Sequence, residues 1–319
     1  MTYFSEKTSV QKCDALLEQY RNAGERAGGA QKLNFGGVDG KDVYNIAAPF
    51  QDDGETIIAG RVESRDSEHS DIVFFTERGG IWLPLEGAPV LRLPDPFHAT
   101  IGGLHVLGGV EIFPHPERPG MLMWRTVLYR GRRIAELERF FEGPDGMKDI
   151  RLVELNDGSV GVFTRPQGEK GGRGKIGFIR IGSLDELTVQ AIEDAPLLEA
   201  HFDDEEWGGA NEAHLLTGGL VGVLGHIARF DEQGNRHYYP IVFVYHPETG
   251  GRTPLKIIAE RADFAPGPSK RPDLEDVVFS GGLIRHGDGT ATLYAGIGDA
   301  EAQRIEIRDP FADYERKPE

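Results

Sequence analysis

The sequence predicts an all-β protein, a five-bladed β-propeller preceded by one amphipathic helix. Three observations lead to this fold class. From residue 33 onward, apolar and polar residues alternate with a period of two, in runs bounded by Gly, Asp, Asn and Pro. The chain contains 43 Gly and 19 Pro, which indicates many tight turns and hence many short strands. Five segments of similar pattern also follow one another along the chain.

The helix is expected close to the N-terminus. The sequence "TSVQ" at residues 8–11 resembles a capping box, which marks the start of a helix. Glycines at 24, 28 and 29 end the helical pattern. We therefore divide the chain into an N-terminal helical segment, 1–32, and a five-bladed propeller domain, 33–319. One helical stripe contains Val10, Cys13, Leu16, Leu17 and Tyr20.

Charge and composition exclude several classes of partner. The net charge of −17 would repel a phosphate backbone or an anionic membrane, so we expect neither nucleic acid nor a membrane as a partner. The single cysteine, Cys13, allows no internal disulfide. The start of the chain lacks a signal-peptide pattern, and no apolar run is long enough to span a bilayer. We expect a cytoplasmic protein that could form an oligomer.

A shared pattern defines the five segments. Each has a carboxylate or amide, an apolar strand, a Gly-containing turn and a second apolar strand. A four-stranded propeller blade needs roughly 40–50 residues, and more with long loops. A sandwich or barrel with accidental similarity is the alternative. Spacings of 50, 54, 63 and 64 residues separate the starting residues, which are Asn45, Asp95, Asp149, Glu212 and Asp276.

Polar residues at the starts of these segments are candidates for a ligand site. In a propeller the innermost strands converge on a central channel, so side chains at their starts face water or a ligand. Arg61 and Glu63 lie two residues apart in a strand, on the same face, and would sit near the mouth of this channel. An exposed strand that carries charges is the alternative. The predicted substrate-binding residues are Asn45, Arg61, Glu63, Asp149, Glu212 and Asp276.

Asp95 is the predicted catalytic residue. It leads a Gly-rich pair of strands in the second segment, within "LPDPFHATIGGLHVLGGVEIF". A carboxylate in a partly closed channel tends to have a raised pKa and can act as a general acid. The same Asp-Pro-Phe sequence recurs at 309–311, so the tripeptide alone is not specific.

Two kinds of sugar cleavage are compatible with these residues. An inverting hydrolase needs a second carboxylate to activate water, and the candidates are Glu63, Asp149, Glu212 and Asp276. A phosphorolytic enzyme instead needs one acid and a cationic cradle for phosphate. The predicted phosphate-binding residues are Lys148, His214, Arg125 and Arg165.

No cofactor or metal ion is expected. The histidines at 98, 105 and 115 lack a helical ligand spacing, and an HExxH motif is absent. The Gly-rich stretch at 168–175 lacks the spacing and the helix of a nucleotide phosphate loop. Among the tryptophans, Trp207 is the one expected to reach a ligand, because it lies just before Glu212.

Several motifs occur in one order over roughly residues 40–300: "FQDDGETIIAGRVESRDSEHSDIVFF", "LPDPF", "GGVEIF", "KDIRLVEL", "NEAHLL" and "DVVFSGGL". Together they resemble the dual-activity β-1,2-mannosyltransferase/phosphorylases, whose bacterial relatives were formerly a domain of unknown function. The resemblance implies a five-bladed propeller distantly related to inverting β-mannoside phosphorylases. It also implies that Asp95 is the single catalytic acid, although those enzymes follow the Asp-Pro with a basic residue where this chain has Phe97.

The implied activity is phosphorolysis of β-1,2-linked mannosides to mannose 1-phosphate, or the reverse synthesis. Some members of the family use a sugar-nucleotide donor. The expected partners are therefore an oligosaccharide and inorganic phosphate or mannose 1-phosphate. A glycoside hydrolase on the same propeller and a non-catalytic oligosaccharide-binding propeller are the alternatives. The resemblance assigns sugar contacts to Asn45, Arg61, Asp149 and Asp276.

Overall fold

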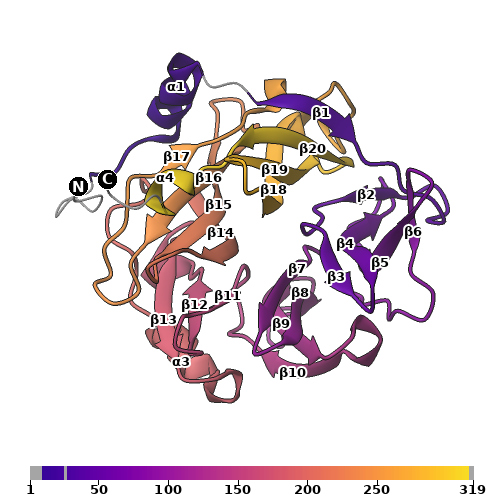
Figure 1. Cartoon of the computed structure of the whole chain (residues 1–319), viewed down its shortest axis with the longest axis horizontal. Helices are drawn as coiled ribbons and strands as arrows, with labels where there is room; N and C mark the ends of the chain where they lie inside the picture. Colours follow the sequence, from indigo (N-terminus) through magenta and orange to yellow (C-terminus); the bar gives the residue numbers. More distant parts are fainter. Residues whose placement is uncertain (1–8, 25–26, 316–319) are drawn as a thin grey trace.

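Short antiparallel strands make up most of the protein, whose computed structural model describes residues 9–24 and 27–315. The all-β prediction is confirmed. The sheets follow one another in chain order around a common centre (Figure 1). Among the described residues, α-helices span Cys13–Ala23 (α1), Gly168–Gly171 (α2), Val189–Asp194 (α3) and Ala312–Glu315 (α4), and 3-10 turns span Ile134–Glu136, Leu184–Glu186, Arg261–Asp263 and Pro272–Leu274.

Hydrogen bonds between described residues define four sheets. The first has the order β2-β4-β5-β6 with β3 beside β4, and its strands are β2 (Asp42–Tyr44), β3 (Phe50–Asp52), β4 (Glu55–Glu63), β5 (Ser70–Arg78) and β6 (Ile81–Pro84). The second contains β7 (Phe97–Ile101), β8 (Leu104–Pro114), β9 (Leu122–Gly131) and β10 (Glu138–Glu142). The third contains β11 (Arg151–Glu154), β12 (Val160–Thr164) and β13 (Gly177–Ile181).

The fourth sheet consists of two antiparallel groups of strands. One group is β14 (Trp207–Leu215), β15 (Val221–Phe230), β16 (Arg236–Tyr245) and β17 (Lys256–Ile257). The other is β18 (Asp276–Arg285), β19 (Thr290–Ile297), β20 (Glu301–Arg308) and β1 (Gly28–Lys32). A short parallel pairing of β16 with β18 joins them, at His237 with Asp276 and at Tyr238 with Val277. The sequence predicts five separate sheets, and this pairing is the reason that four are found.

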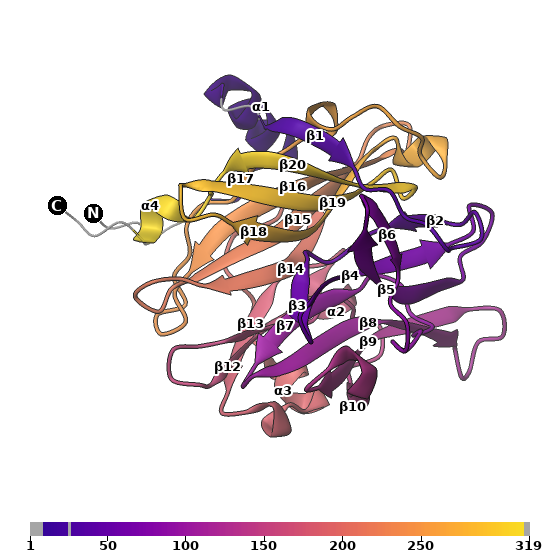
Figure 2. The same cartoon turned by 45° about the vertical axis from the view of Figure 1, so that its right-hand side comes forward.

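Strand β1 completes the last sheet from the opposite end of the chain. It pairs antiparallel with β20, and the register places Gly28 opposite Glu306 and Lys32 opposite Gln303. Both views show β1 along the outer edge of β20 (Figure 2). The sequence analysis places residues 1–32 in an N-terminal segment separate from the main domain, but the last part of that segment, Gly28–Lys32, is a strand of the fourth sheet.

Helix α1 packs on the outside of the strands through one apolar stripe. Cys13 and Leu16 are fully buried, and Leu17 is nearly so, in a core shared with β12, β13, β15 and β16. The helix begins after Lys12, and the backbone N–H of Cys13 donates to Glu206 Oε1 at 2.7 Å. Thr8, the first residue of the expected capping box, lies outside the described residues. No helix within the described part of the chain has the length and apolar character needed to cross a membrane.

Apolar cores fill the spaces between neighbouring groups of strands. One core joins the first sheet to the second, and another joins the second to the third. A third core joins the third sheet to the β14–β17 group, and a fourth joins that group to β18–β20. The fifth brings Tyr294 and Ala302 of the last group against Val43 and Ile58 of the first sheet, which closes the circle.

A close backbone contact at this closure requires glycine at 281. Gly281 is the unpaired residue of a bulge in β18, and an ideal Cβ there would lie 1.7 Å from the carbonyl oxygen of Ile46. We expect Gly281→Ala to lower the free energy of unfolding by about 1–3 kcal/mol, because a backbone oxygen cannot move aside as a side chain would. Urea denaturation would measure this loss.

The matched control is Gly287→Ala, because an ideal Cβ at Gly287 meets no atom within 4 Å. Its stability should stay within about 0.5 kcal/mol of the wild type. Equal stability of the two variants would mean that the contact with Ile46 relaxes without cost.

Candidate functional site

Polar residues with positive φ angles precede three of the strands, β3, β7 and β11. Asn45, Asp95 and Asp149 have φ of 44°, 55° and 62°. Asn and Asp adopt this left-handed region more readily than other non-glycine residues. The strand starts thereby bring side chains together from different sheets, and Asn45 Nδ2 donates to Asp95 Oδ1 at 3.0 Å.

The corresponding positions in the fourth sheet are Asn211 and Ser280. Each of the five residues lies eight or nine positions before a hairpin glycine: 45 to 54, 95 to 103, 149 to 158, 211 to 219 and 280 to 289. Asn211 Nδ2 donates to the carbonyl of Ser280 at 2.8 Å, and Arg151 Nε donates to the carbonyl of Asn211 at 2.9 Å. The sequence pattern instead chose Glu212 and Asp276. The bulge at 210–212 leaves Asn211 unpaired and shifts the register by one residue, which is why the pattern selected the neighbouring Glu212. The bulge at 280–282 lies after Asp276, the first residue of β18, and does not account for the selection of that residue.

Arg61 links Asp95 to the first sheet. Its Nη1 donates to Asp95 Oδ1 at 3.0 Å and its Nη2 donates to Glu63 Oε2 at 2.6 Å, while the guanidinium lies over the ring of Tyr44. Both bonds to Asp95, from Arg61 and Asn45, reach Oδ1. Asp95 Oδ2 therefore receives no hydrogen bond from a described residue and is the oxygen available to a ligand.

The pKa of Asp95 lies below its usual range, and the expectation of a raised pKa is wrong for this structure. Burial alone would raise the pKa of this carboxyl, whose side chain is 12% exposed. The charges of Arg61 and Lys148 and the hydrogen bond from Asn45 outweigh the effect of burial. Asp95 is therefore ionised in the unliganded protein.

Glu63 is a support for Arg61. It is 1% exposed, and its Oε1 accepts hydrogen bonds from Tyr44 Oη at 2.8 Å and from Lys270 Nζ. Burial raises the pKa of Glu63, but the effect of Arg61 and Lys270 is larger and opposite. The pKa therefore lies below its ordinary value, and the carboxylate stays charged. Arg61 and Glu63, on one face of β4, thus form a buried ion pair, and the alternative of an exposed charged strand does not apply.

A cluster of cations surrounds Asp149. Arg151 Nη2 donates to Asp149 Oδ1 at 3.4 Å, and Arg165 Nε lies 3.5 Å from Oδ2. Burial opposes ionisation of Asp149, but the charges of Lys148, Arg165 and Arg151 hold its pKa well below the usual range. Arg165 also donates to the carbonyl of Gly208 at 2.7 Å, yet its buried Nη1 has no hydrogen-bond partner among the described residues.

Two further residues at this centre were not predicted from the sequence. Asp299, with φ of 51°, lies in the turn between β19 and β20; burial raises its pKa to about 6, and the charge of Asp95 adds to this against the effect of Arg61. His226 Nδ1 is 2.7 Å from Asn211 Oδ1. Burial, together with the charge of Arg165, lowers the pKa of His226 to about 3, so it is neutral. A Gly-Asp turn and a histidine within an apolar strand carry no sequence signal for a site.

Four of the expected site residues lie elsewhere. Arg125 is on β9 and pairs with Glu111 at 2.7 Å and with Glu142 at 2.9 Å. Asp276 accepts hydrogen bonds from His237 Nδ1 at 2.6 Å and Tyr239 Oη at 2.5 Å. The remaining two, Glu212 and His214, pair with each other at 2.8 Å and line a separate cavity.

Two aromatic residues also depart from expectation. Trp207 is 7% exposed, and its Nε1 donates to Tyr238 Oη at 3.0 Å, so it packs within its sheet. Phe97, where the resemblance implies a basic residue, has its ring centroid 4.4 Å from the Arg151 guanidinium carbon. The described residues contain no group of three His, Cys, Asp or Glu side chains placed to hold a metal ion.

The strand order and the charged centre define an all-β protein whose sheets surround a common centre of paired carboxylates and cations. Within this class, the chain belongs to the family described as protein of unknown function, DUF1861, whose model matches residues 19–313. No curated protein matches the chain.

Solved structures with high similarity come from Leishmania mexicana. The mannose phosphorylase MPT-4, in complex with a phosphate ion, is 36% identical with a TM-score of 0.86 and covers 94% of this chain and 95% of its own. The GDP-Man-dependent mannosyltransferase MPT-1 is 33% identical with a TM-score of 0.86 and covers 97% of each chain. The β-1,2-mannobiose phosphorylase from Listeria innocua shares the fold at 14% identity, with a TM-score of 0.60 over 90% of this chain and 93% of its own.

The raised pKa of Asp299 predicts a particular dependence of stability on pH. Between its ordinary value of 3.8 and about 6, the native protein keeps a proton that the unfolded chain has released. Stability therefore falls as pH rises through this window and does not fall further above it. Asp299→Asn removes this loss, so the free energy of unfolding of the variant minus that of the wild type should increase from about pH 4 to pH 6 and then level off.

Urea denaturation at a series of pH values would measure this difference. The control is Asp288→Asn, where hydrogen bonds from Thr290 lower the pKa of an exposed turn carboxylate. Its difference from the wild type should stay flat between pH 4 and pH 6. A flat curve for Asp299→Asn as well would show that this carboxyl titrates normally.

Proposed function

We propose that this protein is an enzyme that phosphorolyses or synthesises β-1,2-linked mannosides, with inorganic phosphate or mannose 1-phosphate as its second substrate. One observation carries the proposal: Asp95, which has a free Oδ2, lies beside a cluster of cations in which Arg165 has an unsatisfied Nη1. A carboxyl and a cationic cradle are what phosphorolysis requires. The relative at 36% identity, a mannose phosphorylase in complex with phosphate, supports the same substrates.

We also propose that the fold is a five-bladed propeller. The two antiparallel groups of the fourth sheet then count as two blades, joined by the short pairing of β16 with β18. The apolar cores support this count, because each lies between two consecutive blades and the fifth joins the last blade to the first. The propeller domain then begins at β1 and not at residue 33, since β1 is the outer strand of the last blade.

The residues take the following roles in this proposal. Asn45, Arg61 and Asp299 orient the mannose unit next to Asp95. Lys148, Arg165 and the neutral His226 hold phosphate, which the positive centre attracts in spite of the net charge of −17. Glu63 and Asp149 are positioning residues that fix the guanidinium groups by ion pairs.

In the proposed reaction a phosphate oxygen attacks the anomeric carbon on the face opposite to the glycosidic oxygen. The bond from carbon to the glycosidic oxygen breaks, and a new bond to the phosphate oxygen forms with inversion. Asp95 supplies a proton to the departing oxygen, directly or through a sugar hydroxyl. Because Asp95 is ionised in the free protein, it must first gain a proton. A bound phosphate anion would favour this by offsetting the positive charges of Arg61 and Lys148.

The alternatives make distinct demands on the site. A hydrolase needs a second carboxylate to activate water, but Glu63 and Asp149 are both held in ion pairs. Mannose released in the absence of phosphate would support a hydrolase, and tight oligosaccharide binding without turnover would support a binding protein.

One observation favours a second function: the GDP-Man-dependent relative is 33% identical. GDP release from GDP-mannose with a mannose acceptor would support it.

Substitution of the acid tests the central role. Asp95→Asn should lower the rate of mannose 1-phosphate formation from β-1,2-mannobiose and phosphate by about 10²–10⁴, the usual contribution of general acid catalysis. The wild-type kcat at saturating phosphate should also fall at high pH, where Asp95 loses its proton, whereas the residual rate of the variant should not. Asp185→Asn, at a side chain that is 78% exposed, is the control and should keep the wild-type rate. Wild-type turnover by Asp95→Asn would remove Asp95 from the mechanism.

The phosphate cradle is tested by a pair of arginine variants. Arg165→Gln should raise the KM for phosphate about tenfold or more, because a charge-assisted hydrogen bond to the anion is lost. Arg125→Gln, at an arginine paired with Glu111 and Glu142 away from the centre, should leave this KM unchanged. Thermal unfolding would first establish that both variants are folded. Equal KM values for Arg165→Gln and the wild type would place phosphate elsewhere.

A further inference from the structure

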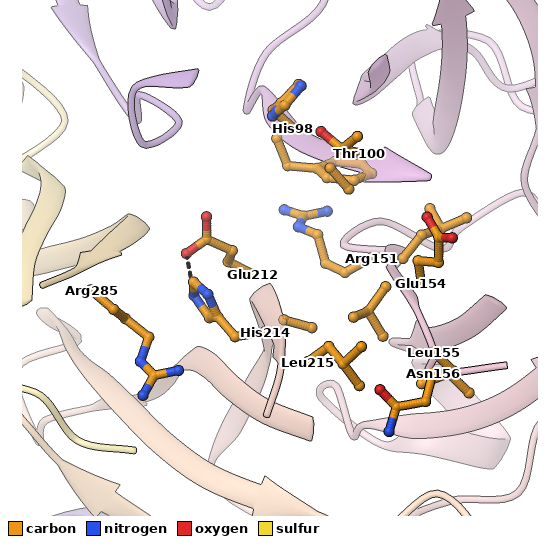
Figure 3. A pocket seen from close by; sticks show the side chains of 15 residues that line it. His98, Thr100, Arg151, Glu154, Leu155, Asn156, Glu212, His214, Leu215 and Arg285 are labelled. Atoms are coloured by element: carbon orange, nitrogen blue, oxygen red, sulfur yellow. Dashed lines mark hydrogen bonds and ion pairs between the residues drawn. The ribbon is translucent and has the colours of Figure 1, made fainter. Parts of the chain in front are cut away.

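A second cavity opens along the inner strands, beyond the centre that contains Asp95. Its volume is about 630 Å³, within the range of small-molecule sites. Most of the lining residues come from β7, β11, β14 and the residues that directly follow β11, and they follow Asp95, Asp149 and Asn211 in the chain. Arg285, at the end of β18, completes the lining. Figure 3 shows side chains from these strands around the space. Its wall includes neither Asp95 nor Arg61, so the cavity is distinct from the proposed catalytic centre.

Arg151 forms the boundary between the two sites. It lines the cavity, while its guanidinium bonds Asp149 and the carbonyls of Ile150 and Asn211. These contacts occupy its Nε, Nη1 and Nη2 and hold the guanidinium in place. The second arginine of the lining, Arg285, donates to Asp309 at 2.8 Å and also to Glu315. Arg285 is thus paired with two carboxylates, and the nitrogens of Arg151 already donate to protein acceptors, so neither side chain offers a ready hydrogen bond to an anion.

The groups left available in the cavity are mainly acceptors. Glu212 Oε2 accepts from His214 and from the backbone N–H of Leu283, which leaves Oε1 without a donor among the described residues. Figure 3 shows this second oxygen pointing away from His214 toward the open space. Glu154 Oε2 accepts from the backbone N–H of Gly102, and Glu154 Oε1 likewise has no donor among the described residues.

A chain of histidines adds another acceptor. His105 Nε2 lies 3.3 Å from Asp52 Oδ1, and His105 Nδ1 lies 2.9 Å from His98 Nε2. A carboxylate favours a proton on the nitrogen that faces it, so His105 donates to Asp52 and accepts from His98. The His98 ring, whose Nε2 then carries the proton, has its Nδ1 free to accept a hydrogen bond from a ligand. Leu215, which is 37% exposed, contributes an apolar surface to the same wall.

We propose that this cavity is a second binding site for an uncharged saccharide, separate from the site of catalysis. An anion would meet Glu212 and Glu154, and an organic cation would meet Arg151 and Arg285. A sugar instead donates hydroxyl groups to the carboxylate and imidazole acceptors and packs its C–H faces on Leu215. The inference does not depend on the reaction at Asp95.

A fluorine label at the cavity tests this site. Leu215→Cys, carrying a trifluoromethyl thiol label, reports on the cavity by ¹⁹F NMR. The native Cys13 should not react, since it is fully buried and burial raises the pKa of its thiol. In phosphate-free buffer, β-1,2-mannobiose should shift the ¹⁹F signal in a saturable way. Adding Glu212→Gln should weaken the apparent affinity about tenfold or more, because a charged acceptor is lost.

The matched control is the same label at Leu122→Cys, an exposed leucine of β9 outside the cavity, whose signal should not move. Asn156→Cys, at an exposed residue of the cavity wall, provides a second label position if Leu215→Cys folds poorly. No saturable shift at either cavity position would overturn the proposal. A response unchanged by Glu212→Gln, or one produced by inorganic phosphate or spermidine in place of the disaccharide, would also overturn it.

Discussion

The centre of the molecule depends on Arg61, a buried cation held between Glu63 and Asp95. Taking these charges out of water is costly, and the cost is offset because each has a defined partner. Glu63 also accepts from Tyr44 and Lys270, so Arg61 is fixed before any ligand arrives. The ion pair between Arg61 and Asp95 helps to keep Asp95 charged, and it links the first sheet to the start of the second. The position of Asp95, its protonation state and the closure of the centre thus share one physical cause.

A similar arrangement around Asp149 explains how a protein of net charge −17 can offer a positive centre. Arg151 and Arg165 are aligned by one carboxylate, so one negative charge organises two cations, and Lys148 acts on both Asp95 and Asp149. The excess of positive charge is local and enclosed. In the proposed function, this local positive charge attracts phosphate in spite of the negative charge of the protein as a whole.

The sequence predicts the all-β class and the polar entries at Asn45, Asp95 and Asp149, because strand periodicity and Gly-containing turns are local signals. It fails at Glu212, since a one-residue bulge changes which side chain faces the centre without changing the local pattern. It fails at Asp276 for another reason: this residue begins β18 and bonds His237 and Tyr239 of the neighbouring strand β16, whereas Ser280 lies within β18. Counting back from the hairpin glycine recovers Asn211 and Ser280. Asp299 and His226 are brought in by the tertiary fold and have no local signal. Arg125 is predicted as a site residue but lies outside the centre. Its acidic partners, Glu111 and Glu142, become neighbours only through strand pairing, which the local sequence does not show.

The seam between β1 and β20 has a consequence for how the molecule forms. Strand β1 cannot pair until β20 has been synthesised, and all the other described strands, β2 to β19, lie between the two in the chain. Contacts between such distant parts of a chain are slow to form. Once β1 has paired with β20, the first sheet and the last group of strands cannot separate without disrupting the sheets next to them. We therefore expect the folded protein to unfold slowly and in one cooperative step.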